Sequence, residues 1–150
     1  GEMELAIRSL ASACEMARAL DNSLCKIRTE IRLALALAVA GQTRRASKLA
    51  AEATVRLPEL HLEFMLDEFL LALGICLSNG VDERLAATCL DWVRTSRRGK
   101  KWTIRRAEEL LEDLGPATCA GGTSDGEGTE LALRAAAQLR SKGGWENEGR

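Results

Sequence analysis

Apolar residues recur at helical spacing along most of the chain, and short polar turns separate the apolar segments. The first segment, residues 3–20, places its apolar side chains on one stripe of a helix. The next, residues 23–40, contains no proline or glycine and is continuously apolar from Leu33 to Ala40. Leucine and alanine dominate this run, whereas a buried strand would more often contain valine, isoleucine and aromatic residues. We therefore predict a helix with two buried faces.

Turn and capping residues divide the rest of the chain into further helices. Gly41 supplies the left-handed conformation with which many helices end, and small apolar residues recur at helical spacing over residues 46–53. Pro58 is tolerated in a first helical turn and starts a long helix that reaches about Ser78. Two more helices are predicted over residues 82–93 and 102–114. The pattern predicts an all-α fold of five to six helices, arranged as antiparallel helical hairpins within residues 1–114.

Residues 27–60 resemble one unit of the tetratricopeptide repeat, a helix-turn-helix of about 34 residues. Glu30, Leu37 and Ala50 occupy the aromatic positions of that family. A second, weaker copy spans residues 67–100, with a turn at Asn79-Gly80. The resemblance implies a stacked α-α superhelix of about two degenerate repeats, and a plain helical bundle is the alternative. The resemblance is carried by five positions with the family's spacing: Ala34, Gly41, Ala46, Ala53 and Pro58.

In that family the first helix of each repeat lines a groove that binds a peptide or a helix of another protein. The lining that the resemblance implies here is largely apolar, which suits an amphipathic helix. The same residues are also interpretable as core. Carried over by position, the partner-binding groove consists of Arg28, Ile31, Leu35, Ala38, Val39, Glu68, Leu71, Ile75, Ser78 and Asn79.

Composition adds bounds to this picture. A length of 150 residues fits one domain, and a net charge of -1 predicts no overall attraction to nucleic acid or membrane. No apolar run approaches the ~20 residues that cross a bilayer, and we expect no signal peptide. We expect a cytoplasmic protein without cofactor or metal. The cysteines form no C-x-x-C pair and are interpreted as small buried hydrophobes in a reducing compartment: Cys14, Cys25, Cys76, Cys89 and Cys119.

A basic cluster is the most unusual local chemistry of the chain. The predicted helix 102–114 carries basic residues at its N-terminal end and acidic residues at its C-terminal end. This arrangement opposes the helix macrodipole and costs about 0.3–1 kcal/mol per terminal charge. We infer that the cluster serves contacts elsewhere, with the acidic start of the 58–78 helix, with an acidic partner, or with phosphate. Its members are Arg94, Arg97, Arg98, Lys100, Lys101, Arg105 and Arg106.

The acidic start of the 58–78 helix is interpreted as a solvated face. Glu59, Glu63 and Asp67 form a row, but nothing basic or nucleophilic is placed for acid/base work with them. His61 has Phe64 and Met65 at the helical positions where a metal site would need a carboxylate. We therefore interpret His61 as a surface residue.

The C-terminal part of the chain differs from the rest. Residues 115–128 contain five glycines and are predicted to form a flexible linker, followed by a short helix at 129–142 and a disordered tail at 143–150. Three alternatives are open for this helix: it docks on the repeats, it binds a neighbouring molecule, or it stays loose. Its apolar stripe is itself a candidate occupant of the groove. Because two repeats expose apolar surface at both ends, we expect a monomer with capping helices or a homodimer.

Three classes of function follow from these observations. A non-enzymatic scaffold or adaptor that binds a peptide or amphipathic helix is favoured. A helical regulatory domain that contacts nucleic acid or an acidic partner through the 94–106 cluster is second, and it predicts binding that weakens steeply with salt. An enzyme is the least favoured class, since the chain has one His, no Tyr and no nucleophile motif.

Overall fold

The computed structural model describes residues 1–60, 63–116 and 128–143, and within these ranges every regular element is a helix. The all-α prediction is therefore confirmed. The count of five to six helices is too low, because the described residues form seven helices of more than one turn. They are α1 (Glu2–Ala19), α2 (Ser23–Val39), α3 (Thr43–Thr54), α5 (Leu66–Ser78), α6 (Glu83–Thr95), α7 (Lys101–Leu114) and α8 (Gly128–Gly143).

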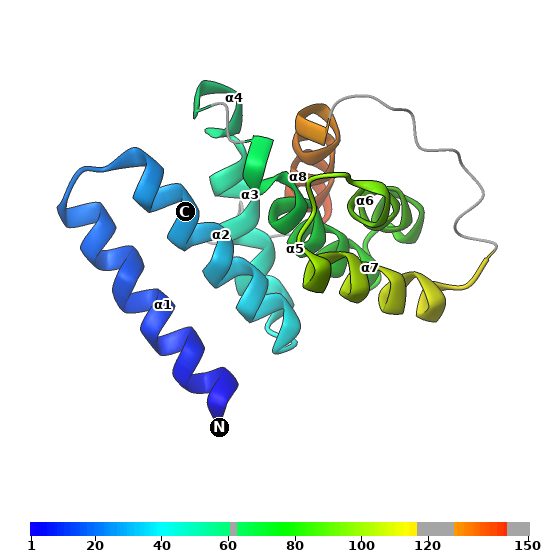
Figure 1. Cartoon of the computed structure of the whole chain (residues 1–150), viewed down its shortest axis with the longest axis horizontal. Coiled ribbons are helices and arrows are strands. Elements are labelled where there is room, and N and C mark those ends of the chain that lie inside the picture. The colour runs from blue at the N-terminus through cyan, green and yellow to red at the C-terminus, as the bar shows by residue number, and fades with distance from the viewer. Residues whose placement is uncertain (61–62, 117–127, 144–150) are drawn as a thin grey trace.

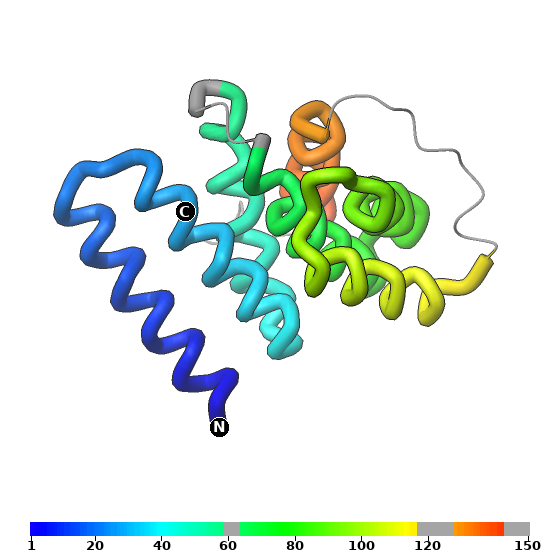
Figure 2. The backbone as a smooth tube through the Cα atoms, viewed as in Figure 1, coloured from blue at the N-terminus to red at the C-terminus, as the bar shows by residue number. Residues whose placement is uncertain are grey.

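Helices that are neighbours in the sequence pack side by side, and α5 lies at the centre of the molecule (Figure 1). The pairs α1–α2, α2–α3, α5–α6 and α6–α7 are each joined by a short connection, and the backbone trace shows them as successive hairpins (Figure 2). α5 also contacts α2, α3, α7 and α8. Every residue from Leu66 to Leu77 is buried as a result.

The turns between helices follow the local sequence. Gly41 and Gly80 adopt φ values of 81° and 85°, which a residue with a side chain rarely adopts. The side chains of Asn22 and Asp82 cap α2 and α6 by accepting backbone N–H groups at 3.0 Å, from Cys25 and Leu85 respectively. These caps satisfy donors that each helix start would otherwise leave unpaired.

Gly74 permits a close approach between α5 and α6. A Cβ atom at this position would lie 2.8 Å from Cδ2 of Leu90 on α6. The two helices therefore pack more closely than an alanine at position 74 would allow without movement of Leu90. Small residues act in the same way on α3, whose Ala46, Ala50 and Ala53 are buried against its neighbours.

The prediction of one long helix from Pro58 to Ser78 is wrong. α4 (Leu57–Leu60) is one turn, a short 3₁₀ turn (η1, Glu63–Met65) follows, and α5 begins at Leu66. No proline or glycine between Pro58 and Gly74 marks this break in the sequence. The break coincides with long-range contacts of Asp67 and Glu68 in the first turn of α5, so tertiary packing decides where that helix starts.

Glu30 forms a buried ion pair in the α1–α3 region. Its side chain is buried, and Arg56 and Arg18 provide the opposite charges. Arg56 donates a hydrogen bond to Oε2 of Glu30, and Nη2 of Arg18 lies 3.7 Å from Oε1. These ion pairs connect α1, α2 and the end of α3.

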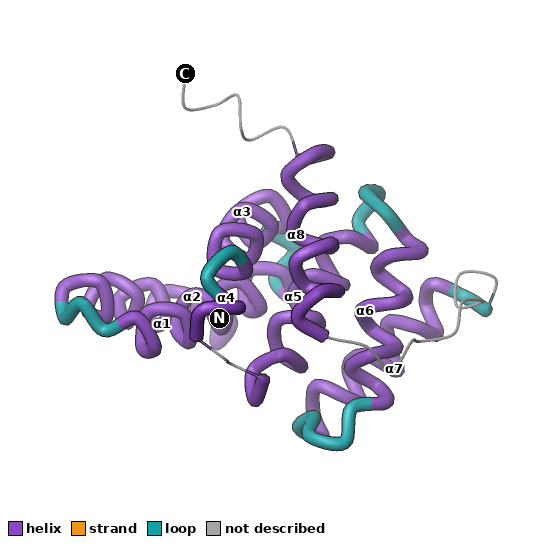
Figure 3. Tube along the Cα trace, turned by 90° about the horizontal axis from the view of Figure 1, so that it is seen from above, coloured by secondary structure: helices purple, strands orange, loops and turns teal. Residues whose placement is uncertain are grey.

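The C-terminal helix docks on the hairpins. α8 packs against α3, α5 and α6, on the side of α5 that faces away from α7 (Figure 3). Arg140 donates to the carbonyl of Ala51 at 2.8 Å, and Gln138 donates to Asp82 at 3.1 Å.

The predicted bounds of 129–142 agree with the observed helix within one residue at each end. The central part of the predicted linker, 117–127, and the predicted tail from residue 144 onward lie outside the described residues. Four apolar side chains of α8 are buried where it packs against α3, α5 and α6: Ala132, Ala135, Ala136 and Leu139.

Candidate functional site

A groove of about 750 Å³ opens between the α1–α2 hairpin and α7, and we refer to it as the α2–α7 groove. One wall is mostly apolar and comes from α1 and α2, while the other is mostly charged and comes from the start of α7. Among the residues that line it, α5 contributes Glu68. The apolar wall consists of Met3, Ala6, Leu10, Leu35, Ala36 and Val39, together with Arg32, and the opposite wall consists of Lys100, Trp102, Arg105, Arg106 and Glu109.

Three large apolar side chains in this groove remain accessible to solvent. Met3 is 42% exposed, Val39 is 39% exposed and Trp102 is 51% exposed. They come from α1, α2 and α7, so a molecule in the groove would contact three helices through apolar surface. Exposed apolar side chains that gather around one groove indicate an interaction site more strongly than single scattered ones do.

The carboxylate of Glu68 lies buried at the edge of the groove. Oε1 lies 3.0 Å from Nζ of Lys100, and Oε2 lies 3.6 Å from Nε of Arg32. Oε2 is inaccessible to solvent and accepts no hydrogen bond from the described residues. Most buried polar atoms have at least one such partner. Glu68 is therefore balanced by two cations but incompletely hydrogen-bonded.

Asp67, the preceding residue, fixes the start of α7. Its Oδ2 accepts hydrogen bonds from the backbone N–H of Lys100 at 3.1 Å and from the hydroxyl of Thr103 at 2.9 Å. The prediction that Asp67 belongs to a solvated face is wrong, because its side chain is buried in this contact. The consequence for the groove is that α5 holds the basic wall in place.

Four members of the basic cluster form ion pairs within the chain. Lys100 lies 3.5 Å from Asp67 and 3.0 Å from Glu68, so the predicted pairing with the acidic residues near the start of that helix is confirmed for this lysine. Arg94 pairs with Asp91 on α6, and Arg105 and Arg106 lie 3.5 Å and 3.2 Å from Glu109 on α7. The side chains of the other members, Arg97, Arg98 and Lys101, are exposed.

The predicted groove residues divide between the groove and the core. Leu35, Val39 and Glu68 line the α2–α7 groove. Arg28 is exposed on α2 away from the groove lining, the Ser78 hydroxyl donates to the carbonyl of Ile75, and Asn79 donates to Thr43 and Ile75. The core interpretation is right for four of the predicted residues: Ile31, Ala38, Leu71 and Ile75.

The repeat resemblance did not predict the groove residues that come from α1 and α7. Met3, Ala6 and Leu10 belong to a helix that the repeat resemblance treats as a cap, and Trp102 belongs to the helix after the second repeat. One sequence signal was available, since Trp102 is an aromatic residue interleaved with the basic cluster. An aromatic residue among cations is a common feature of recognition surfaces.

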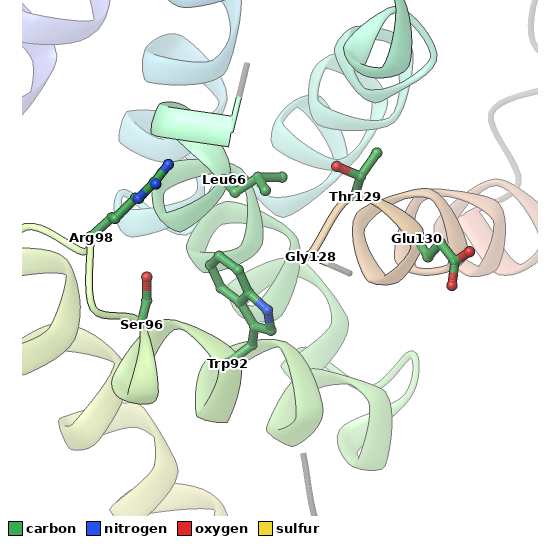
Figure 4. Close-up of a pocket in the computed structure, with 7 residues that line it drawn as sticks. All are labelled: Leu66, Trp92, Ser96, Arg98, Gly128, Thr129 and Glu130. Carbon is green, nitrogen blue, oxygen red and sulfur yellow. The ribbon is translucent and has the colours of Figure 1, made fainter. Parts of the chain in front are cut away.

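A second hollow of about 510 Å³ lies between the end of α6 and the start of α8 (Figure 4). The ring of Trp92 reaches from α6 toward Leu66 and Gly128, and Ser96 and Arg98 form the opposite edge. Within the described residues, the buried polar atoms without a hydrogen bond belong to Glu68 and Arg106, and neither lines this hollow. We therefore take the α2–α7 groove as the candidate site.

The cysteines follow their predicted burial with one exception. Cys14, Cys76 and Cys89 are buried, but Cys25 is exposed in the first turn of α2, and Cys119 lies outside the described residues. Burial raises the pKa of the Cys76 thiol to about 11 and that of the Cys89 thiol to about 12, from an ordinary value of 9.0. These two thiols are therefore protonated at neutral pH.

Two other features of the described residues bear on the site. They contain no group of three or more His, Cys, Asp or Glu side chains arranged to hold a metal ion, and His61 lies outside them. None of their helices is both long enough and apolar enough to cross a membrane.

Comparison of the chain with protein-family models, with curated proteins and with solved structures gives no significant match. The resemblance of residues 27–60 to the tetratricopeptide repeat therefore rests on the spacing of its residues and stays a prediction.

Proposed function

We propose that the chain is a protein-interaction module of the helical-repeat type, which binds an amphipathic helix or peptide of another protein in the α2–α7 groove. The observation that carries this proposal is the exposed apolar surface of Met3, Val39 and Trp102 around one groove. Laying the apolar face of an amphipathic helix into an apolar groove is a recurring mode of protein recognition.

The packing order of the helices supports a repeat-type arrangement. α5 packs against α6, its partner in one hairpin, and also against α2 and α3, the two helices of the preceding hairpin. These are the neighbour relations expected of hairpins stacked in a row. In such a stack the first helices share one side, and the α2–α7 groove is lined by residues of the first helices α2 and α5, together with α1 and the start of α7.

A synthetic peptide tests the proposal directly. The probe is a fluorescein-labelled helix of about 18 residues, with leucine at positions i, i+3, i+4 and i+7 and glutamine elsewhere. We expect fluorescence anisotropy to report saturable binding to the wild-type chain. In the variant Ala36→Trp the indole ring occupies the groove, so we expect binding to weaken by about tenfold or more.

The matched control is Ala137→Trp, which introduces the same side chain at an exposed position of α8. This variant should bind the peptide as the wild type does. Thermal unfolding followed by circular dichroism checks that both variants fold. Equal binding to the wild type and Ala36→Trp would contradict the proposal, as would the absence of binding to any form of the chain.

Nucleic-acid binding is a second candidate, favoured by the position of Trp102. This residue is 51% exposed and follows the exposed Lys101, and exposed aromatic residues among cations stack on the bases of single strands. The triple variant Arg97→Glu, Arg98→Glu, Lys101→Glu tests it with a labelled oligo(U) single strand. If the chain binds nucleic acid, the affinity of the wild type for this strand should fall steeply with salt concentration, and the triple variant should not bind it.

A further inference from the structure

We propose that the partner helix of the α2–α7 groove is acidic along the flank that faces α7. This inference rests on the proposed function and names the chemistry of the partner. It follows from the different character of the two walls, from the excess of positive charge that lines the groove, and from a donor of Arg106 that is unpaired among the described residues.

Positive charge exceeds negative charge in the groove. Four basic and two acidic side chains line it, which leaves an excess of two positive charges. Three of the four basic residues, Lys100, Arg105 and Arg106, belong to the α7 wall, whereas the α1–α2 wall contributes Arg32 alone. Because the whole chain has a net charge of -1, this excess is a local property of the groove.

The two acidic groups in the groove are already engaged. Glu68 is buried and lies 3.0 Å from Lys100. Glu109 is shared between Arg105, at 3.5 Å, and Arg106, at 3.2 Å. One carboxylate therefore serves two guanidinium groups, which together present more donors than it can accept. Nε of Arg106 is buried and makes no hydrogen bond within the described residues.

A bound helix would remove water from these guanidinium groups. The side chain of Arg105 is 83% exposed and that of Arg106 is 43% exposed, so in the free chain water reaches their remaining donors other than Nε of Arg106. Covering a cation without giving it an acceptor is costly. A carboxylate on the partner accepts from a guanidinium in a charge-assisted hydrogen bond, which is stronger than a neutral one. A neutral or basic flank would leave these donors unpaired.

The two walls also fix how apolar and acidic residues are arranged on the partner. Its apolar stripe packs against Met3, Leu35 and Val39, and its acidic residues lie beside that stripe on the side toward Arg105 and Arg106. Carboxylates on successive turns of the partner helix suit this pair, because residues three or four apart lie on one face. The chain thereby selects one orientation of the partner about its own axis.

Three peptides with one leucine stripe test the inference. They are the glutamine-flanked probe described above and two versions in which the flank facing α7 carries glutamate or lysine. At roughly 50 mM salt we expect the glutamate peptide to bind about tenfold or more tightly than the lysine peptide, and at roughly 500 mM salt we expect the difference to shrink.

Charge reversal on the chain supplies the second arm. In the double variant Arg105→Glu, Arg106→Glu, we expect the lysine peptide to bind more tightly than the glutamate peptide, which reverses the order of the two affinities. The control double variant Arg84→Glu, Arg134→Glu changes the net charge by the same amount at exposed positions of α6 and α8. It should retain the wild-type order. Circular dichroism melting establishes that both double variants are folded.

The outcomes separate this inference from the proposed function. Equal binding of the glutamate and lysine peptides, with binding still blocked by Ala36→Trp, would overturn the acidic partner and leave the groove as a binding site. No binding of any of the three peptides would overturn both. Binding of an oligo(U) strand that is lost in Arg105→Glu, Arg106→Glu but unchanged in Ala36→Trp would assign the basic wall to nucleic acid and also overturn the inference.

Discussion

On one side of α5, the C-terminal helix α8 fills the space between α3 and α6 with three alanines and a leucine. On the other side, α2 and α7 leave a groove of about 750 Å³. Both sides belong to the same helix, whose residues from Leu66 to Leu77 are all buried. The difference therefore comes from the side chains that the neighbouring helices contribute.

Small apolar side chains close one side, and charged side chains keep the other side open. Ala132, Ala135 and Ala136 let the backbone of α8 approach α3 and α5 closely. The groove, in contrast, is bordered by Arg32, Arg105 and Arg106, whose side chains stay partly in water. Closing the groove within the chain would require desolvating these groups, which costs free energy unless acceptors are supplied.

The largest expected effect comes from truncating one leucine on each side. Leu139 of α8 is 1% exposed, and Leu139→Ala leaves an enclosed cavity, so we expect a loss of about 2–5 kcal/mol in the free energy of unfolding. Leu35 of α2 is 5% exposed but lines the groove, and Leu35→Ala leaves a space that opens to solvent. We expect the loss in the free energy of unfolding for Leu35→Ala to lie near the lower end of that range. Urea unfolding measures both, and a greater loss for Leu35→Ala would contradict the comparison.

The two neighbouring carboxylates of α5 should differ in a smaller but clear way. Asp67→Asn weakens the hydrogen bonds to Lys100 and Thr103, and we expect a loss of about 1–3 kcal/mol. Glu68→Gln leaves an amide oxygen that can still accept from Lys100, and Oε2 of Glu68 accepts no hydrogen bond from the described residues, so we expect a change within about 1 kcal/mol. The same unfolding measurement tests the pair. Equal losses would show that the buried charge of Glu68 matters as much as the hydrogen bonds of Asp67.

The cysteines on the two sides should differ in their rate of chemical modification, without a change in stability at neutral pH. Cys76 faces Ser47 of α3, and Cys89 lies near Arg134 of α8, so both thiols belong to the closed side of α5. At about pH 8 we expect iodoacetamide to modify the exposed Cys25 and to modify Cys76 and Cys89 about a hundredfold more slowly, as followed by mass spectrometry. Rapid modification of Cys89 in the folded chain would mean that the α8 side opens readily.

The pH dependence of stability follows from the same thiols. The pKa of Cys76 rises from 9.0 to about 11 on folding, so above pH 9 the unfolded chain releases this proton before the folded chain does. The free energy of unfolding should therefore be insensitive to this group below pH 9 and should fall as the pH rises toward 11. In Cys76→Ala this contribution is absent, and Cys25→Ala serves as the matched control.

Much of the local structure was determined by the sequence alone. The turns at Gly41 and Gly80, the caps at Asn22 and Asp82 and the bounds of the C-terminal helix depend on residues within one or two turns of each position. The chemistry of such short segments is visible in the order of the residues. The all-α fold follows for the same reason, because helical periodicity is a local property.

Only the tertiary structure decided how α5 begins and which residues form the groove. Asp67 is buried because it bonds to Lys100 and Thr103, which are 33 and 36 residues away. The walls of the groove combine Met3 with Trp102, from nearly opposite ends of the helical core. A periodic pattern tells which residues share a face of a helix, but it does not tell which of several buried or half-buried faces meets another helix. That choice depends on long-range packing, and it also placed α8 on the side of α5 away from the groove.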